Sequence, residues 1–314
     1  MAYMKALYNQ KVLLILIVLI LFASFFAPYF LTLGNIFNLL MEISIYGIMA
    51  FAMTFVILNG EFDLSIGAVM AFSGIFLATI SQHMNIFIAI FLTILLGAII
   101  GCVMGLLVSL LGFNSFIVTL CAMFFYNGLT LKLSDGKPIM SQDPFLNWLG
   151  NGSFLYIPNV VWIFIIFFAI AEYILRKTKY GRNVYAVGGD QKVALLTGIS
   201  VRFYKVSVFV ISGACASIAG ILLTGMLNAA SPFVGGAAAL SVISSVVIGG
   251  TSLAGGEGGV KQTIMGLLIL GILDNALALL NVHSFYQSLI LGCLLVTVIG
   301  WDYYSRNVKV ANTV

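Results

Sequence analysis

The sequence predicts an all-α protein that crosses a membrane many times, and three observations lead to this fold class. Of the 314 residues, 62% are hydrophobic and only 8% are charged, whereas soluble domains are nearer to half apolar and a quarter charged. The 32 glycines and 12 methionines suit close helix packing and broken helices. Apolar runs of bilayer length recur along the chain. We therefore expect one transmembrane domain over residues 1–314.

The apolar runs predict about ten transmembrane helices, some of them broken. The first run, 12–30, follows two lysines; a cleaved signal peptide is the alternative, but the run is long and lacks a clear small-residue cleavage site. Five further spans before the most basic part of the chain are expected at 41–58, 64–81, 86–111, 115–131 and 158–175. Four more are expected after it at 206–227, 237–253, 262–280 and 285–301.

The distribution of basic residues predicts that both chain ends lie in the cytoplasm. With the N-terminus inside, six crossings bring residues 176–205 back inside, and four more leave Arg306 and Lys309 inside. On this path Lys132 and Lys137 are the basic residues that face outward. This arrangement obeys the rule that cytoplasmic loops carry the excess of Lys and Arg.

The most polar part of the chain is the stretch 176–205, which we expect to be a cytoplasmic loop. It holds seven of the fourteen Lys and Arg residues, namely Arg176, Lys177, Lys179, Arg182, Lys192, Arg202 and Lys205. Gly188 and Gly189 permit a sharp turn. Asp190 is placed to cap a short helix, and Gly198 is placed to end it.

This short helix, at about 190–198, has an apolar side formed by Val193, Ala194, Leu195 and Leu196. An amphipathic helix held outside the membrane is typical of an element that binds another protein. The alternative is a solvated basic loop that serves only to orient the chain. The cap, the apolar side and the bracketing glycines favour the docking element.

Two carboxylates, Glu61 and Asp63, lie between two apolar runs. A charged group near the bilayer is costly unless it faces water or a partner, so both are candidates for a translocation pathway. For Asp63 the favoured interpretation is a cap on the next helix, with substrate contact as the alternative. Glu61 either lines the pathway or lies in water at the membrane edge.

Further polar residues lie inside apolar runs: Asp274 and Asn275 in one, and Asn127 in another. For the asparagines, a hydrogen bond between helices is the alternative to a functional role. An ionised carboxylate such as Asp274 rarely lies within a span without a pathway or a partner. Together with aromatic residues such as Phe116, these groups are candidates to line a passage for a polyol-like solute.

Several sites are excluded. The glycine run 249–259 lacks the lysine and the preceding strand of a phosphate-binding loop, and flexible backbone beside a cavity is the better interpretation. The breaks at 60–64 and 249–253 both interrupt apolar runs, but their spacing does not support an internal repeat. No nucleophile–base or metal-ligand set is present, so we expect no catalysis, metal or cofactor in this chain.

Six stretches distributed over most of the chain resemble the ribose-type carbohydrate permeases of bacterial ABC importers. They are residues 60–67, 116–120, 179–189, 196–199, 247–256 and 284–287. The resemblance implies the type II permease architecture of vitamin B12 importers, a permease dimer, two cytoplasmic ATPase domains that bind the ATP, and an extracytoplasmic binding protein. It also implies that the segment from Gly188 to Gly198 is the coupling helix, seated in a cleft of the ATPase.

The chain departs from the family pattern at several positions. Glu61 stands where family members often have glycine, Asn127 replaces an arginine, and Asp274 replaces an asparagine. Ala239 and Ser241 stand where the family usually has acids. The second permease is therefore either another copy of this chain or a non-identical subunit that retains those acids.

The resemblance implies a permease subunit in the bacterial inner membrane that imports a sugar or a related small polar solute, with ribose or another pentose favoured. Nucleosides and sugar-derived signal molecules are alternative substrates. A proton-coupled secondary transporter, with Asp274 or Glu61 as a relay, is the alternative of a different class. It leaves the capped basic stretch unexplained.

Overall fold

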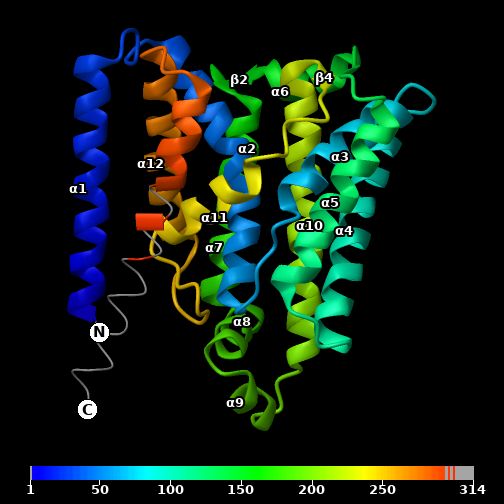
Figure 1. Ribbon diagram of the computed structural model, residues 1–314, viewed down its shortest axis with the longest axis vertical. Coiled ribbons are helices and arrows are strands. Elements are labelled where there is room, and N and C mark those ends of the chain that lie inside the picture. Colours follow the sequence, from blue (N-terminus) through cyan, green and yellow to red (C-terminus); the bar gives the residue numbers. More distant parts are fainter. Residues whose placement is uncertain (1, 294–295, 298–299, 301–314) are drawn as a thin grey trace.

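The computed structural model describes residues 2–293, 296–297 and 300, and these residues form a bundle of long, roughly parallel and antiparallel helices (Figure 1). The longer helices are α1 Ala2–Phe26, α2 Leu33–Leu58, α3 Ile66–Ile80, α4 Ile86–Leu110, α5 Ser115–Ser134, α7 Asn159–Lys177, α10 Val201–Leu227 and α12 Val260–Leu279. The shorter helices are α6 Pro144–Asn151, α8 Lys179–Gly189, α9 Gln191–Leu196 and α11 Ala238–Ile248.

Short strands lie at one end of the bundle. Strand β1 Ile139–Met140 pairs antiparallel with β4 Ala229–Ala230, and β2 Ser153–Phe154 pairs with β3 Ile157–Pro158 in a hairpin. Helix α6 lies at the same end, whereas α8 and α9 project from the opposite end (Figure 1).

Each expected span up to residue 280 overlaps one helix, but the expected number of about ten membrane-crossing helices is not confirmed. Among the described residues, 6 helices are long and apolar enough to cross a membrane: α2, α4, α5, α7, α10 and α12. Helices α3 and α11 have 15 and 11 residues, so they are about 22 and 16 Å long. A bilayer core is about 30 Å thick.

The non-helical segments before these two helices explain why they are short. Residues 59–65 precede α3 and residues 231–237 precede α11, and most of each segment has no helical backbone. The expected span 285–301 lies partly outside the described residues. The described residues 284–293, at its start, are helical. Arg306 and Lys309 also lie outside them.

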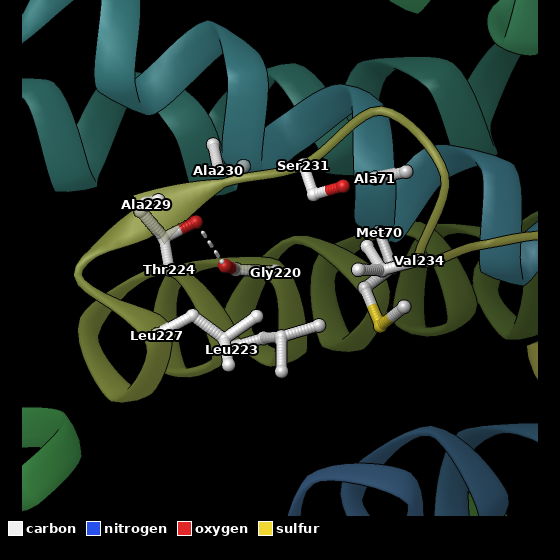
Figure 2. Close-up of a pocket in the computed structure, with 11 residues that line it drawn as sticks. Met70, Ala71, Gly220, Leu223, Thr224, Leu227, Ala229, Ala230, Ser231 and Val234 are labelled. Atoms are coloured by element: carbon white, nitrogen blue, oxygen red, sulfur yellow. Dashed lines mark hydrogen bonds between the residues drawn. The ribbon is translucent and has the colours of Figure 1, made fainter. Parts of the chain in front are cut away.

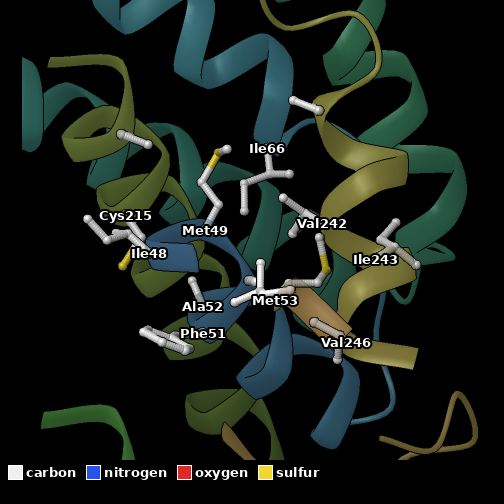
Figure 3. Close-up of a cluster of buried hydrophobic side chains, with 14 of the residues drawn as sticks. Ile48, Met49, Phe51, Ala52, Met53, Ile66, Cys215, Val242, Ile243 and Val246 are labelled. Atoms are coloured by element: carbon white, nitrogen blue, oxygen red, sulfur yellow. The ribbon is translucent and has the colours of Figure 1, made fainter. Parts of the chain in front are cut away.

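Helix α2 is the centre of the fold and packs against α7, α10, α11 and α12. Its side chains at Ile48, Met49 and Met53 are fully buried. Figure 3 shows them surrounded by Ile66 of α3, Cys215 of α10, and Val242, Ile243 and Val246 of α11.

The tightest helix pair is formed by α4 and α10, through a stripe of glycines. A side chain on Gly97, Gly101 or Gly105 of α4 would overlap the α10 backbone or Ser217. Small residues at this spacing let helices in a membrane approach closely, where lipid supplies no hydrophobic driving force for association. The glycine content therefore has a direct packing role.

Candidate functional site

The expected capped helix is present as α9, at the end of the bundle from which α8 and α9 project. Asp190 is its N-cap, and the carboxylate Oδ1 accepts the backbone N–H groups of Lys192 and Val193 at 2.8 and 3.1 Å. Gly198 follows the C-cap with φ +82°. The expected cap at Asp190 and the expected helix end at Gly198 are confirmed, although the helix is shorter than 190–198.

The C-terminus of α9 is closed by two backbone hydrogen bonds. The N–H of Gly198 donates to the carbonyl of Leu195, and the N–H of Ile199 donates to the carbonyl of Ala194, both at 3.0 Å. This pair of bonds with a left-handed glycine is the Schellman motif, which satisfies the last carbonyls of a helix. Helix α9 is therefore fixed at both ends in spite of its six residues.

The apolar residues of α9 divide into an inner and an outer set. Ala194 is 2% exposed, whereas Val193, Leu195 and Leu196 are 55%, 65% and 87% exposed. Ala194 therefore supports the helix from within. The three exposed side chains form a small apolar surface at the tip of the molecule, of the kind that marks a protein contact.

The expected sharp turn at Gly188 and Gly189 is wrong. Both residues are helical and form the last turn of α8, and the chain turns at Asp190 instead. Gly188 has a different role, because a Cβ there would overlap the carbonyl oxygen of Leu58 and lie 2.9 Å from the N atom of Gly256. The missing side chain allows three backbones to touch.

Three segments meet at this point: the end of α8, the break after α2, and the glycine run 249–259. The N–H of Gly256 donates to the carbonyl of Leu58 at 3.0 Å. The hydroxyl of Tyr185 donates to the carbonyl of Gly258 at 2.8 Å. The expected breaks at 60–64 and 249–253 are confirmed as non-helical. Their contact with each other and with α8 was not anticipated.

The two acids of the first break are held by partners. Glu61 is 6% exposed, and its Oε1 lies 2.6 Å from Nζ of Lys205 at the start of α10. Asp63 is 1% exposed. Its Oδ1 accepts the N–H of Ser65 at 2.9 Å, and its Oδ2 accepts the Ser212 hydroxyl at 2.6 Å.

These contacts give both acids a structural role in the conformation observed. Asp63 binds the turn that begins α3 through the N–H of Ser65, but Ser65 is the N-cap residue, so the expected N-cap at Asp63 is wrong. Glu61 joins the break to α10 through an ion pair, and neither of the two alternatives weighed for it anticipates this pairing.

A polar cavity of about 60 Å³ lies between α2, α11 and α12. Its polar lining consists of Glu42 and Tyr46 of α2, Ser241 and Ser245 of α11, and Asp274 of α12. Among the described residues, no hydrogen-bond partner is found for the enclosed Oδ1 atom of Asp274. The cavity thus presents carboxylate and hydroxyl oxygens to whatever occupies it.

Of the expected pathway residues, the structure brings only Asp274 to this cavity. Asn275 forms a reciprocal amide pair with Asn35 of α2, with both Nδ2–Oδ1 distances at 2.9 Å, so the helix–helix hydrogen bond is confirmed. Asn127 and Phe116 lie on α5 and do not line the cavity.

Glu42 was missed by the sequence reasoning. The signal was available, because Glu42 is a carboxylate near the start of the apolar run 41–58. A rule that treats every charge within a span as a candidate would have included it.

A second cavity, of about 10 Å³, lies between α3, α10 and β4 and is almost entirely apolar. Figure 2 shows Met70, Leu223, Leu227 and Val234 around it, with the Thr224 hydroxyl bonded to the carbonyl of Gly220. It has room for about one water, so it is a packing defect. The described residues also bring together no group of three or more His, Cys, Asp or Glu side chains that would hold a metal.

Comparison with known proteins gives consistent matches over almost the whole chain. A family model described as "branched-chain amino acid transport system / permease component" matches residues 35–299. The chain is 39% identical over 306 residues to the ribose import permease protein RbsC of Haemophilus influenzae, covering 96% of this chain and 94% of that protein.

Two other relatives agree. The ribose import permease protein RbsC of Bacillus subtilis is 41% identical, covering 91% of this chain and 90% of that protein. The L-arabinose ABC transporter permease protein AraH of Azospirillum brasilense is 39% identical, covering 94% of this chain and 88% of that protein. No solved structure gives a significant match.

Proposed function

The chain belongs to the family of branched-chain amino acid transport system permease components, and on this premise we propose that it is the membrane-spanning subunit of an ATP-driven sugar importer. The observation that carries the proposal is the similarity to permeases named for ribose and L-arabinose, over 96%, 91% and 94% of this chain. A pentose such as ribose is therefore the favoured substrate. The chain is a transport subunit, and ATP hydrolysis belongs to separate subunits.

We assign α9 as the coupling helix that docks on an ATPase subunit. Its exposed Leu195 and Leu196 supply the apolar contact, and its two capped ends allow it to transmit force without unwinding. The full importer then contains two ATPase domains, a second permease and an extracytoplasmic binding protein. The second permease is either a second copy of this chain or a related subunit.

We further propose that the chain lies in the bacterial inner membrane with the α8–α9 end and both termini in the cytoplasm. Helix α1 begins at the same end as α8 and α9 (Figure 1), and this end carries the basic stretch 176–205. The short helices α3 and α11 complete crossings together with the non-helical segments before them. With the six long helices, α1 and the expected span 285–301, the number of crossings comes to about ten, in the type II arrangement.

The solute route passes the polar cavity at Glu42 and Asp274. Carboxylate and hydroxyl oxygens suit a ligand rich in hydroxyl groups, and weak polar contacts allow its release. A cavity of about 60 Å³ holds a few waters, so a sugar passes only when α2, α11 and α12 separate. ATP binding and hydrolysis on the partner subunits drive that separation.

The test uses the permease reconstituted in proteoliposomes with its ATPase and binding-protein partners. Uptake of labelled ribose should require ATP, stop when the ATPase is inactivated by mutation, and be insensitive to a proton uncoupler. Uptake that survives ATPase inactivation and collapses with the uncoupler would contradict the importer and establish the proton-coupled carrier. Competition by arabinose, nucleosides and sugar-derived signal molecules would then rank the substrates.

A further inference from the structure

We propose that Tyr185 and Gly188 of α8 form a joint that moves the break after α2 and the loop 249–259 together whenever α9 moves. The inference deepens the proposed function and rests on it. It makes Tyr185 a positioning residue for ATP-driven transport, because it acts through the two segments that it and Gly188 hold against α8.

The contact between the three segments is made by backbone atoms. A Cβ on Gly255 would lie 2.7 Å from the carbonyl oxygen of Gly188 and 3.0 Å from Cα of Gly60. A Cβ on Gly256 would lie 2.9 Å from Cα of Gly189. No side chain therefore separates α8 from either segment. Because no rotamer change can absorb a displacement here, movement of α8 is passed on directly.

Hydrogen bonds keep the three segments together when α8 is pulled away from them as well as when it is pushed toward them. The Gly256 N–H binds the carbonyl of Leu58, and the Tyr185 hydroxyl binds the carbonyl of Gly258. Burial raises the pKa of the Tyr185 hydroxyl above its usual value, so it remains a donor at physiological pH. Val184 and Val187, on the inner side of α8, are fully buried and hold the helix in place.

The loop 249–259 is compact enough to move as one piece. The Ser252 N–H donates to the carbonyl of Glu257 at 2.8 Å, so the loop closes on itself. Thr251 Oγ1 accepts the N–H of Gly259 at 3.4 Å, next to the start of α12. A displacement of Gly256 and Gly258 is thus transmitted to α12, because the loop between them and α12 does not deform.

The joint leads to both sides of the polar cavity. Leu58 is the last residue of α2, which carries Glu42 and Tyr46. The loop 249–259 joins α11, which carries Ser241 and Ser245, to α12, which carries Asp274. A single displacement of α8 therefore reaches all three helices that line the cavity.

The experiment compares Tyr185→Phe with the matched control Tyr180→Phe in the complete transporter with its ATPase and binding-protein partners. Tyr180 lies on the same helix, and its hydroxyl is bonded to the Ser207 hydroxyl at 2.7 Å, away from the joint. Each variant removes one hydroxyl and keeps the ring. The measured quantity is the number of ribose molecules imported per ATP hydrolysed, together with the ATPase rate and the amount of assembled complex.

We expect Tyr185→Phe to assemble and hydrolyse ATP at the normal rate but to import about fivefold less ribose per ATP. A change of about fivefold is what the loss of one hydrogen bond typically produces in an equilibrium. Tyr180→Phe should keep the normal ratio. An unchanged ratio in Tyr185→Phe, or an equal fall in both variants, would overturn the joint. Either result leaves the proposed function intact if ribose uptake by the unmodified transporter depends on ATP.

A second measurement covers the case in which Tyr185→Phe assembles poorly. Spin labels on α9 and on the exposed side of loop 249–259 report whether the two segments keep their separation when ATP is added. A constant separation, while both labels move relative to α10, is the expected result. Independent movement of α9 and the loop would overturn the proposal.

Discussion

The α8 joint and the polar cavity between α2, α11 and α12 are built in opposite ways. At the joint, backbone atoms of three segments touch, and the polar groups of Tyr185, Gly256 and Leu58 are hydrogen-bonded. At the cavity, there is about 60 Å³ of space, and within the described part of the chain the Oδ1 atom of Asp274 finds no hydrogen-bond partner. A buried polar atom without a partner costs free energy unless a solute or water meets it.

In the proposed function, this difference separates a region for transmission from a region for binding. A segment that passes on movement must not deform, so its backbones touch directly and hydrogen bonds tie them together. A segment that holds and releases a solute must offer space and weak, exchangeable contacts. Substitutions in each region should therefore differ in what they change: those near α8 and α9 should affect docking and stability, and those at the cavity should affect solute uptake.

The largest effect is expected from a substitution at the tip of α9, the helix next to the joint. Leu195→Asp should weaken binding of the ATPase by about a thousandfold, because an unpaired carboxylate in a protein contact costs about 4 kcal/mol. Co-purification and binding titration with the ATPase measure the loss, and membrane insertion should be normal.

The matched control for Leu195→Asp is Leu155→Asp. Leu155 is 68% exposed at the opposite end of the molecule and has φ +52°, which aspartate tolerates. Equal losses of ATPase binding in the two variants would remove α9 from its docking role.

The buried ion pair between Glu61 and Lys205 comes next. Glu61→Gln should lower the free energy of unfolding by about 3 kcal/mol, because it leaves a mostly buried ammonium without its partner. Thermal unfolding in detergent measures the change. Glu172→Gln is the control, since its ion-pair partners Arg176 and Lys261 are 54% and 57% exposed. The expected loss is below about 1 kcal/mol. A small effect at Glu61 would show that the pair does not hold the break to α10.

Adjacent glycines at the end of α8 give a finer test of backbone contact. Gly188→Ala should destabilise the protein by about 2 kcal/mol, because the new methyl group overlaps the carbonyl of Leu58. Gly189→Ala should be neutral or slightly stabilising, since no atom lies within 4 Å of the position that its Cβ would take. Similar unfolding temperatures for both variants would argue against the close contact at Gly188.

On the cavity side, the expected effects are smaller and concern transport instead of stability. Asp274→Asn and Glu42→Gln should each raise the ribose concentration needed for half-maximal uptake by about fivefold, because each weakens a hydrogen bond to the solute. ATPase binding and unfolding temperature should be unchanged. Normal uptake in the double variant would contradict a solute route through this cavity.

The structure also shows which features local sequence can predict. The cap at Asp190 and the left-handed Gly198 depend on residues within a few positions, so the pattern was sufficient. The role of Gly188 depends on Leu58 and Gly256, which are far away in the chain. A glycine needed for a turn and a glycine needed for close contact look the same in a sequence.

The same limit applies to the acids. The sequence shows three unusual charges beside or within apolar runs: Asp63, Glu61 and Asp274. Helix packing decides what each of them meets, namely Ser212 for Asp63, Lys205 for Glu61 and the polar cavity for Asp274. Spans were found because about 20 apolar residues are a local property. The short lengths of α3 and α11 were not predicted, since an apolar residue in a turn or loop has the same hydropathy as one in a helix.

The central claim is that the tip of α9 contacts an ATP-hydrolysing subunit, and photo-crosslinking tests it most directly. The photoreactive amino acid benzoylphenylalanine in place of Leu196, which is 87% exposed, should crosslink to the ATPase in membranes of cells that produce the whole transporter. The account predicts a single crosslinked product that contains the ATPase. Crosslinking only to lipid or to the extracytoplasmic binding protein would contradict it.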